Sequence, residues 1–545
     1  MLHFFYFLIF YLLIFLVGRS LTALCYRYIL DKNCKDSQKA FNRPIYYFYT
    51  LLGLFFIGNI SVINNFFFKN NIFYLKVIFL LLVLFNLTER IQIRINLLNT
   101  LNFLLIPIII SMSTLTIGLA YDAGLYQLNS QLWIRESSIP LGLYNLHFRY
   151  GFSSIIEYIS SNFWLENSFE ILHFVNISFI ASFLGFLSYN LLKNKEPFLS
   201  FSSLAIFIFG ILDNFGAGGG RNGFIDIESI TKQDTPFGIL FYLSNILIIF
   251  ALLKKGIDTS EVLFISLLLL FSIQMRIFGI TTLVLFCYML FALKKITLKT
   301  LKILLPSIVL GIFWGLKNLL ISGCLLFPVE LSCFNSISWY QKGSANFEMQ
   351  ELKNFHLGYD LGTSLSEWFS LWIIKDININ TLVNFLFSLI FIWIFFTLFT
   401  KKREMVFVKL NIILGIYMFL IIYVWASTSP GIRLGIGIFL LFIGIITLNI
   451  NDWKSEKFNN KFIGITILIT CTVFIPRLDN YKEFINNPLI YNSISPPQVD
   501  YVQKLGYGVL PTNGSQCWVN LECVQNSKEI VKSSIYSYKL FEIKK

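Results

Sequence analysis

Long apolar runs dominate this sequence, and they limit the folds that the chain can adopt. Their approximate bounds are 2–18, 45–62, 72–88, 96–119, 170–191, 197–213, 237–253, 261–275, 277–293, 302–322, 380–399, 406–425, 434–450 and 462–476. A helix of about 20 residues crosses the hydrocarbon core of a bilayer, which is about 30 Å thick. Only 13% of the 545 residues are charged, whereas soluble domains contain about 25%. We therefore predict an all-α polytopic membrane protein with about 14 transmembrane helices.

The segments that connect these runs carry most of the basic residues, and they predict an orientation. Segment 19–44 contains six Lys or Arg residues but only two acids, and every second connecting segment after it is also basic. Positive charge concentrates in cytoplasmic loops, so we expect both termini to lie outside the cytoplasm. The net charge of +13 then follows from membrane topology, and it gives no reason to expect a nucleic-acid partner.

The long segments on the opposite side are the expected location of any functional site, because long loops in compact proteins are usually functional. They are 120–169, 214–236, 323–379, 426–433 and 477–545. We predict one transmembrane domain over residues 1–476. A small extracytoplasmic segment with strand-like pieces should follow over residues 477–545.

Two features of these long segments have more than one interpretation. The pairs Cys324/Cys333 and Cys517/Cys523 fit either disulfides in an oxidising compartment or free thiols. Segment 155–169 mixes apolar and polar residues. It fits either an amphipathic helix at the membrane interface or a helix packed on the other loops.

Asp122 is the main candidate for catalysis, because it lies just beyond the fourth apolar run. A carboxylate there can act as a general base toward a hydroxyl group. The alternative is an ordinary polar residue at a helix end, or a partner in an ion pair. Tyr126, Trp133, His147 and Arg149 follow in the same segment, and we expect them to position a substrate.

Basic residues in the long segments are candidates for binding phosphate. His147 and Arg149 are separated by two positions and would share one face of an extended segment. Arg149 could instead form an ion pair with Glu136 or Asp122. Three further cations sit at the same ends of apolar runs, namely Arg276, Lys317 and Arg433. They suit an anionic lipid headgroup, although snorkelling toward the membrane surface is the default role for such residues.

Asp234 precedes the seventh apolar run in the sequence Asp-Thr-Pro. Asp with Pro close behind is a common helix start. The functional alternative is a second acid, or a metal ligand, that faces Asp122. A divalent cation is therefore possible, but no metal-binding motif requires one and no cofactor is certain.

Short motifs along the chain resemble the GT-C superfamily of membrane glycosyltransferases. More closely, they resemble a group of uncharacterised bacterial integral membrane proteins that are regarded as GT-C-like. The motifs are Tyr121–Gln127, Trp133, Gly142–Gly151, Asp234–Pro236, Ser322–Pro328, Ser429–Arg433 and Gln516–Trp518. The pattern has His where Gln127 stands, an acid where Gly431 stands and an aromatic residue where Leu434 stands, so this chain departs from it at three positions.

The resemblance implies an inverting glycosyltransferase in the bacterial inner membrane. Such an enzyme takes a sugar from a polyprenyl-phosphate donor and passes it to a glycan or lipid acceptor outside the cytoplasm. Asp122 would be the general base, and Arg276, Lys317 and Arg433 would hold the phosphate. A polymerase or ligase of surface polysaccharide is a second hypothesis, and a transporter or flippase of lipid-linked sugars is a third.

Overall fold

Apolar helices make up most of the computed structural model. It describes residues 2–30, 39–40, 43–71, 73–86, 101–112, 115, 118–165, 169–192, 196–214, 232–357, 365–402, 408–428, 430–453, 482, 485–486, 494–526 and 528–544. Each predicted run up to 434–450 contains a described helix, and the run 462–476 lies outside the described residues. These helices are α1 (Leu2–Ile29), α2 (Tyr49–Asn65), α3 (Phe73–Phe85), α5 (Ile106–Met112), α8 (Leu172–Leu192), α9 (Pro197–Asn214), α10 (Asp234–Lys254), α11 (Thr259–Met275), α12 (Thr281–Ala292), α13 (Leu298–Ser322), α16 (Asp376–Phe399), α17 (Val408–Thr428) and α18 (Ile436–Ile446).

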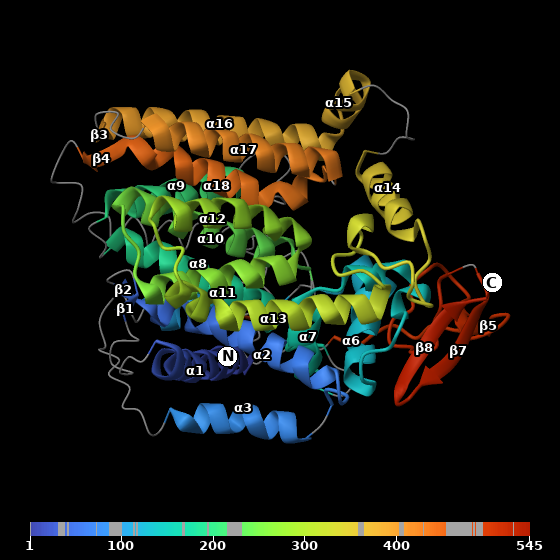
Figure 1. The fold of residues 1–545 in the computed structure, drawn as a ribbon. Coiled ribbons are helices and arrows are strands. Elements are labelled where there is room, and N and C mark those ends of the chain that lie inside the picture. Colours follow the sequence, from blue (N-terminus) through green and yellow to red (C-terminus); the bar gives the residue numbers. More distant parts are fainter. Residues whose placement is uncertain are drawn as a thin grey trace.

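Seven of the described helices are long and apolar enough to cross a membrane. Most of the helices run in one general direction and stack in layers, with α16 and α17 along one side and α1 and α3 along the other (Figure 1). The chain is thus a mostly helical protein with several candidate membrane spans.

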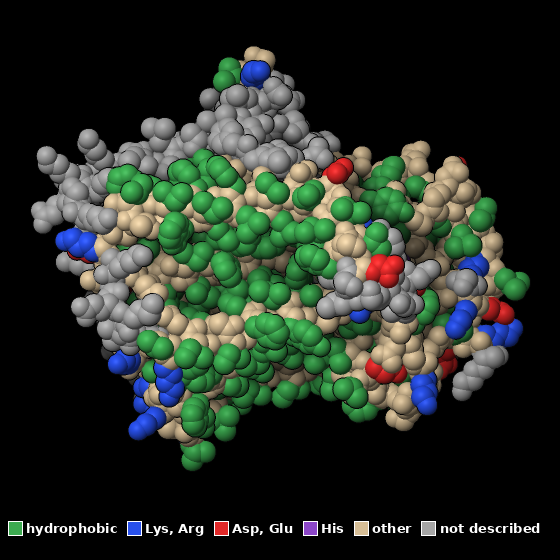
Figure 2. Space-filling view, turned by 90° about the horizontal axis from the view of Figure 1, so that it is seen from above, with side chains coloured by type: hydrophobic (Ala, Val, Ile, Leu, Met, Phe, Trp, Pro, Cys, Tyr) green, Lys and Arg blue, Asp and Glu red, His purple; other side chains and the backbone are tan. Residues whose placement is uncertain are grey.

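Burial differs sharply among the apolar helices. The most apolar window of α10 is 94% buried, whereas the corresponding windows of α13, α16 and α17 are only 17%, 28% and 22% buried. Hydrophobic side chains cover the face that α16 and α17 present, and Lys and Arg gather toward the two ends (Figure 2). An apolar surface between polar ends suits a protein whose solvent is lipid.

The first helix is longer than the sequence predicts. The predicted run ends at residue 18, but α1 continues to Ile29 and includes Arg19 and Arg27. The Arg19 guanidinium donates to the Asn86 side chain at 2.8 Å. Because this contact satisfies the half-buried guanidinium, the charge does not end the helix.

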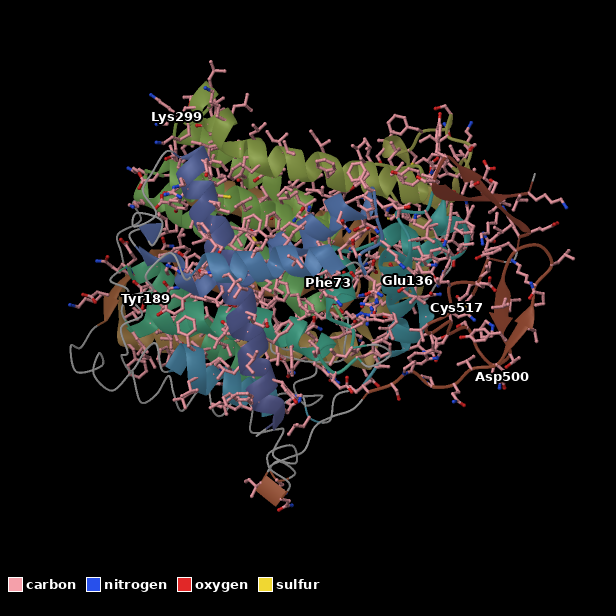
Figure 3. The ribbon with its side chains drawn as sticks, turned by 90° about the horizontal axis from the view of Figure 1, so that it is seen from below. Phe73, Glu136, Tyr189, Lys299, Asp500 and Cys517 are labelled. Atoms are coloured by element: carbon pink, nitrogen blue, oxygen red, sulfur yellow. A yellow bond between two sulfur atoms is a disulfide. The ribbon has the colours of Figure 1, made fainter. Side chains whose placement is uncertain are left out.

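The remaining elements gather at the two ends of the bundle. One end holds β1 (Lys39–Ala40), β2 (Arg43–Pro44), β3 (Thr400–Lys402) and β4 (Ile450–Trp453). The other end holds α6 (Leu128–Glu136), α7 (Ile155–Ser160), α14 (Ser344–Leu357), α15 (Leu365–Ile373), β5 (Tyr501–Gln503), β6 (Val509–Pro511), β7 (Ile530–Ile535) and β8 (Tyr538–Ile543). We call this second end the loop-rich end. Glu136, Cys517 and Asp500 lie there, and Lys299 and Tyr189 lie toward the opposite end (Figure 3).

The strands in the described part of the chain form four two-stranded antiparallel sheets. Strand β8 of the β7–β8 hairpin forms backbone hydrogen bonds with Leu141. The Leu141 N–H donates to the Lys539 carbonyl at 2.8 Å, and the Phe541 N–H donates to the Leu141 carbonyl at 2.9 Å. The C-terminal segment therefore packs directly on the loop that contains Asp122.

Distant segments share one hydrophobic core at the loop-rich end. Its buried members include Trp133, Tyr144, Phe327, Val524 and Phe541. These residues come from three of the long segments predicted to lie on one side of the membrane. Shared burial of large side chains fixes these segments relative to one another.

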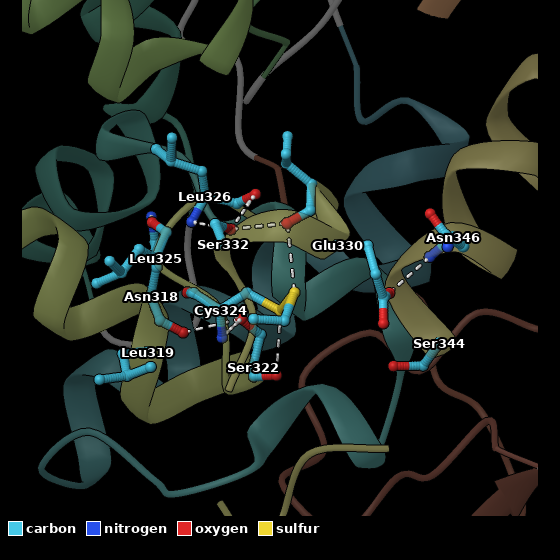
Figure 4. Close-up of a disulfide and its surroundings, with 12 residues drawn as sticks. Asn318, Leu319, Ser322, Cys324, Leu325, Leu326, Glu330, Ser332, Ser344 and Asn346 are labelled. Atoms are coloured by element: carbon cyan, nitrogen blue, oxygen red, sulfur yellow. Dashed lines mark hydrogen bonds between the residues drawn. A yellow bond between two sulfur atoms is a disulfide. The ribbon is translucent and has the colours of Figure 1, made fainter. Parts of the chain in front are cut away.

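Both predicted cysteine pairs form disulfides, Cys324–Cys333 and Cys517–Cys523. The first closes a short loop that contains Glu330, whose carboxylate accepts from the Asn346 N–H (Figure 4). The same carboxylate accepts from the Gly343 N–H. These two bonds satisfy backbone groups at the start of α14, where a negative charge is favourable.

Segment 155–169 follows the second of its two predicted interpretations. All residues of α7 are buried, and Ile155 and Ile159 meet Gly58 of α2. The helix is therefore packed against α2 of the bundle, with its side chains buried.

Candidate functional site

Asp122 lies at the start of a widened helical turn. It precedes the π-helical turn η4 (Ala123–Gln127), which continues into α6. π-Turns of this kind occur often at functional sites. The Asp122 side chain is partly exposed, and among the described residues no hydrogen bond or ion pair engages its carboxylate. A carboxylate with free lone pairs can accept a proton from a substrate.

Tyr126 is the point where several predicted site residues meet. Burial raises the pKa of its hydroxyl, the charges of Asp122 and Glu157 act in the same direction, and Arg149 opposes them. The His147 ring packs edge-on against Tyr126, with 6.2 Å between ring centroids. Tyr126 is thus a half-buried residue that contacts the His147 ring and whose pKa responds to the charges of Asp122 and Arg149.

His147 and Arg149 do not form a pair of cations. His147 precedes the 3-10 turn η6 (Phe148–Phe152), and its Nδ1 accepts from the Arg149 N–H at 3.4 Å. Burial, with a smaller contribution from Arg149, lowers the pKa of His147 to about 3. The imidazole is therefore neutral near pH 7, and only Arg149 supplies a positive charge for an anion.

Arg149 forms neither of the two ion pairs that the sequence suggested, with Glu136 or with Asp122, among the described residues. Its guanidinium lies 5.7 Å from the centre of the Phe152 ring. Its charge lowers the pKa of Glu348, although burial raises that pKa overall to about 6. Glu136 instead forms an ion pair with Lys69 at 3.5 Å.

Trp133 lies in the packed core of the loop-rich end. Its side chain is 1% exposed, and its ring packs edge-on against Phe541 at 5.5 Å. The Lys539 ammonium lies 5.0 Å from the ring centre. Trp133 therefore fixes the loops in place, and in this structure it presents no accessible surface to a substrate.

Asp234 joins two of the three predicted phosphate-binding cations. One carboxylate oxygen forms an ion pair with the Arg276 guanidinium, and the other lies 3.9 Å from Nε of Arg433. Asp234 begins α10, Arg276 directly follows α11, and Arg433 lies in the 3-10 turn η10 (Ile432–Gly435). We call these three residues the Asp234 triad.

The Asp234 triad carries an excess of positive charge in an accessible position. It combines two arginines with one acid, and the side chains of Arg276 and Arg433 are 18% and 36% exposed. The N-terminus of α10 adds the positive end of a helix dipole. Such a site suits an anion. Asp234 thus begins a helix, as predicted, and its carboxylate pairs with arginines. Among the described residues, no contact joins Asp234 to Asp122.

Lys317 stands apart from the two arginines. Its side chain is fully buried, and its ammonium lies 3.5 Å from the centre of the Trp314 ring and 5.6 Å from that of Tyr158. Its Nζ has no hydrogen-bond partner among the described residues. The charge of Glu157 acts on this ammonium.

Glu157 is a charged residue that the sequence reasoning missed. Its Oε2 accepts from the hydroxyls of Ser130 at 2.8 Å and Ser153 at 3.1 Å. Burial raises the pKa of Glu157 to about 7, and the Ser130 hydrogen bond and the Lys317 charge act in the opposite direction. The sequence does contain a signal for Glu157, because this acid stands between the apolar pairs Ile155-Ile156 and Tyr158-Ile159. We call Glu157 and Lys317 the sealed pair.

The sealed pair and the Asp234 triad are neighbours. The hydroxyl of Ser154, at the start of α7, donates to the Met275 carbonyl at 2.9 Å. Met275 directly precedes Arg276. This hydrogen bond links the segment of Glu157 to the segment of Arg276, and Asp122 lies at the same loop-rich end. Among the described residues, no three His, Cys, Asp or Glu side chains gather as metal ligands.

The fold and this charged region define a mostly helical membrane protein with one polar, loop-rich end. Residues 1–440 match the sequence family described as a domain of unknown function, DUF8201. Because the match covers most of the 545 residues, the chain belongs to this family. No curated protein and no solved structure matches the chain.

Proposed function

We propose that this protein is a membrane glycosyltransferase of GT-C type with a lipid-linked sugar donor. The donor is a polyprenyl-phosphate sugar, and the acceptor is a glycan or lipid of the cell surface. The protein would cross a bacterial inner membrane about 14 times, with the loop-rich end and both termini outside the cytoplasm. The observation that carries this proposal is the partly exposed carboxylate of Asp122, which no described residue engages, at the same end as the cationic Asp234 triad.

Asp122 has the properties that the transfer step requires of a general base. In that step an acceptor hydroxyl attacks the anomeric carbon as the bond from that carbon to the phosphate oxygen breaks. The hydroxyl proton passes to the Asp122 carboxylate, and the bonding electrons leave with the lipid phosphate. Attack opposite to the leaving group inverts the anomeric configuration.

The Asp234 triad supports the proposal as a site for the leaving phosphate. Arg276 and Arg433 come from different helix ends and both point at Asp234. Guanidinium groups bind phosphate oxygens with two hydrogen bonds. Charge that develops on the departing phosphate would be stabilised there, which lowers the barrier to bond cleavage.

A polymerase or ligase of surface polysaccharide remains the main alternative, because Arg149 is a partly buried cation whose charge, like that of Asp122, acts on Tyr126. Such an enzyme would depend on Arg149 and His147 for phosphate binding. The neutral state of His147 disfavours that role, since a neutral imidazole contributes no charge to a diphosphate.

The test is Asp122→Asn in a deletion strain complemented with the variant. We expect sugar transfer in isolated membranes to fall about 100- to 10,000-fold, because general-base catalysis contributes that much. Mass spectrometry of extracellular glycans should show the same missing component as the deletion. Asp500→Asn is the matched control, since Asp500 is exposed at the same end (Figure 3). Near-normal transfer by Asp122→Asn together with its loss in Arg149→Ala would favour the polymerase or ligase.

A further inference from the structure

The disulfide loop Cys517–Cys523 and the residues before it contact the segment that carries Asp122. The Gln516 side chain donates to the Tyr121 carbonyl at 2.9 Å, and the Trp518 N–H donates to the Gly124 carbonyl at 2.8 Å. The Asn129 side chain donates to the Asn520 carbonyl at 2.7 Å. Two of these hydrogen bonds fix the backbone on both sides of Asp122, and the third fixes the Asn129 side chain, to residues almost 400 positions later.

The Trp518 indole packs directly against this turn. A methyl group at Gly124 would lie 2.6 Å from the indole ring, so only glycine allows this approach. Trp518 is nearly buried, and it shares a hydrophobic cluster with Ala123 and Leu128. Its φ of +47° lies in the left-handed region, which a bulky residue adopts only where its surroundings impose it.

The residues that directly follow the disulfide loop contact the segment of His147 and Arg149. The N–H groups of Gln525 and Asn526 donate to the Leu146 carbonyl at 2.9 and 3.1 Å. The Asn526 side chain donates to the Asn145 carbonyl at 3.0 Å. Leu146 directly precedes His147. One short stretch of chain therefore bridges the segment of Asp122 and the segment of His147 and Arg149.

The disulfide holds the two sides of this bridge together. Cys517 lies beside Trp518, and Cys523 lies two residues before Gln525. Both sulfur atoms are buried, and the Cys517 carbonyl accepts from the Tyr501 hydroxyl at 2.8 Å. Closing a short loop reduces the number of conformations open to the residues on either side.

We infer that Trp518, held by the Cys517–Cys523 loop, is a positioning residue that aligns Asp122 with the His147–Arg149 segment. The inference rests on the proposed function in assigning Asp122 to catalysis. Positioning matters because a displacement of about 1 Å costs about a hundredfold in rate. Trp518 acts through the Tyr121–Gln127 backbone, and among the described residues it makes no contact with the Asp122 carboxylate.

The experiment measures backbone order and sugar transfer in the same full-length variants. Hydrogen exchange of the purified protein is followed in peptides that cover residues 121–128 and 143–150, with a peptide from α10 as internal reference. In Trp518→Ala we expect exchange in 121–128 to be about tenfold faster, because a packed indole and its hydrogen-bonded turn are released. Sugar transfer at equal membrane content should fall by a similar factor. Trp518→Phe, which keeps a ring on Gly124, should restore most of both.

Two controls separate positioning from general damage. Leu505→Ala removes an exposed side chain from the same C-terminal segment, and it should change neither exchange nor transfer. The double variant Cys517→Ser/Cys523→Ser should reproduce Trp518→Ala in part. In every variant the α10 peptide should exchange at the wild-type rate, which shows that the bundle is folded.

The outcomes distinguish this inference from the proposed function. Unchanged exchange in 121–128 for Trp518→Ala would overturn the inference. Faster exchange with full transfer would also overturn it, provided that Asp122→Asn abolishes transfer. Full transfer by Asp122→Asn would instead overturn the proposed function, and the catalytic part of this inference with it.

Discussion

The sealed pair and the Asp234 triad use similar residues in opposite ways. Glu157 and Lys317 are buried, and the acid is held by two serine hydroxyls. Asp234 is shared by two arginines that remain partly exposed. Buried charges are costly when one partner is removed, whereas exposed ones are screened by solvent. The comparison suggests that the sealed pair fixes structure and that the triad is available to a ligand.

The largest effect should come from breaking the sealed pair. Lys317→Met keeps an unbranched side chain of similar size and removes the cation whose charge acts on Glu157, which should cost about 3–5 kcal/mol of unfolding free energy above pH 7, where Glu157 is ionised. Thermal unfolding in detergent measures this loss as a lower midpoint. The double variant Glu157→Gln/Lys317→Met should recover most of it. If Lys317→Met unfolds like the wild type, the pair has no structural role.

The triad should respond in activity more than in stability. Arg276→Ala removes the cation closest to Asp234, and sugar transfer should fall about a hundredfold, as when one group that stabilises developing charge is lost. Arg276→Lys should be intermediate, because an ammonium cannot make the two parallel hydrogen bonds of a guanidinium. Lys299→Ala, at the opposite end of the molecule, is the control. Full transfer by Arg276→Ala would contradict a phosphate site at the triad.

A pH titration of unfolding should test whether the buried Glu157 of the sealed pair contributes to stability. Burial raises the pKa of Glu157 from its ordinary 4.5 to about 7, so the folded protein binds this proton more tightly than the unfolded chain does. The associated stability is fully present below pH 4.5 and is lost as the pH rises through about 7. We expect the unfolding midpoint of the wild type to fall over this window relative to that of Glu157→Gln. Parallel curves for the two proteins would show that Glu157 does not titrate there.

The smallest effect should come from an exposed ion pair at the same end. Lys69 and Glu136 are 3.5 Å apart, and their side chains are 48% and 32% exposed. Lys69→Gln should change the unfolding free energy by less than about 1 kcal/mol. A loss as large as that of Lys317→Met would mean that burial does not explain the difference between the pairs.

Hydropathy predicted the helices because each apolar run carries its own signal. Hydropathy ended the first run at residue 18, because Arg19 is charged, whereas α1 continues to Ile29. The contact from Arg19 to Asn86 joins residues 67 positions apart, and no local pattern reports it. The prediction that a helix starts at Asp234 also used only neighbouring residues, and α10 does begin there.

The grouping of charges could not be predicted in the same way. The sequence showed three cations at equivalent ends of apolar runs, but the partner of Lys317 is Glu157, which lies 160 positions earlier. Similarly, nothing in the sequence near Trp518 indicates that it packs on Gly124. Such contacts depend on how the helices are arranged, and helix arrangement has no short-range signature.

The contacts between Trp518 and Gly124 also set an order of assembly. Residue 124 leaves the ribosome long before residue 518, so the Asp122 turn must wait for the end of the chain before its partner exists. Until then the surface that Trp518 covers stays open, and the segments of Asp122 and His147 are not yet bridged. A chain whose synthesis stops between Arg433 and Trp518 would thus carry every charged residue of the candidate site without the contacts that hold the Asp122 turn.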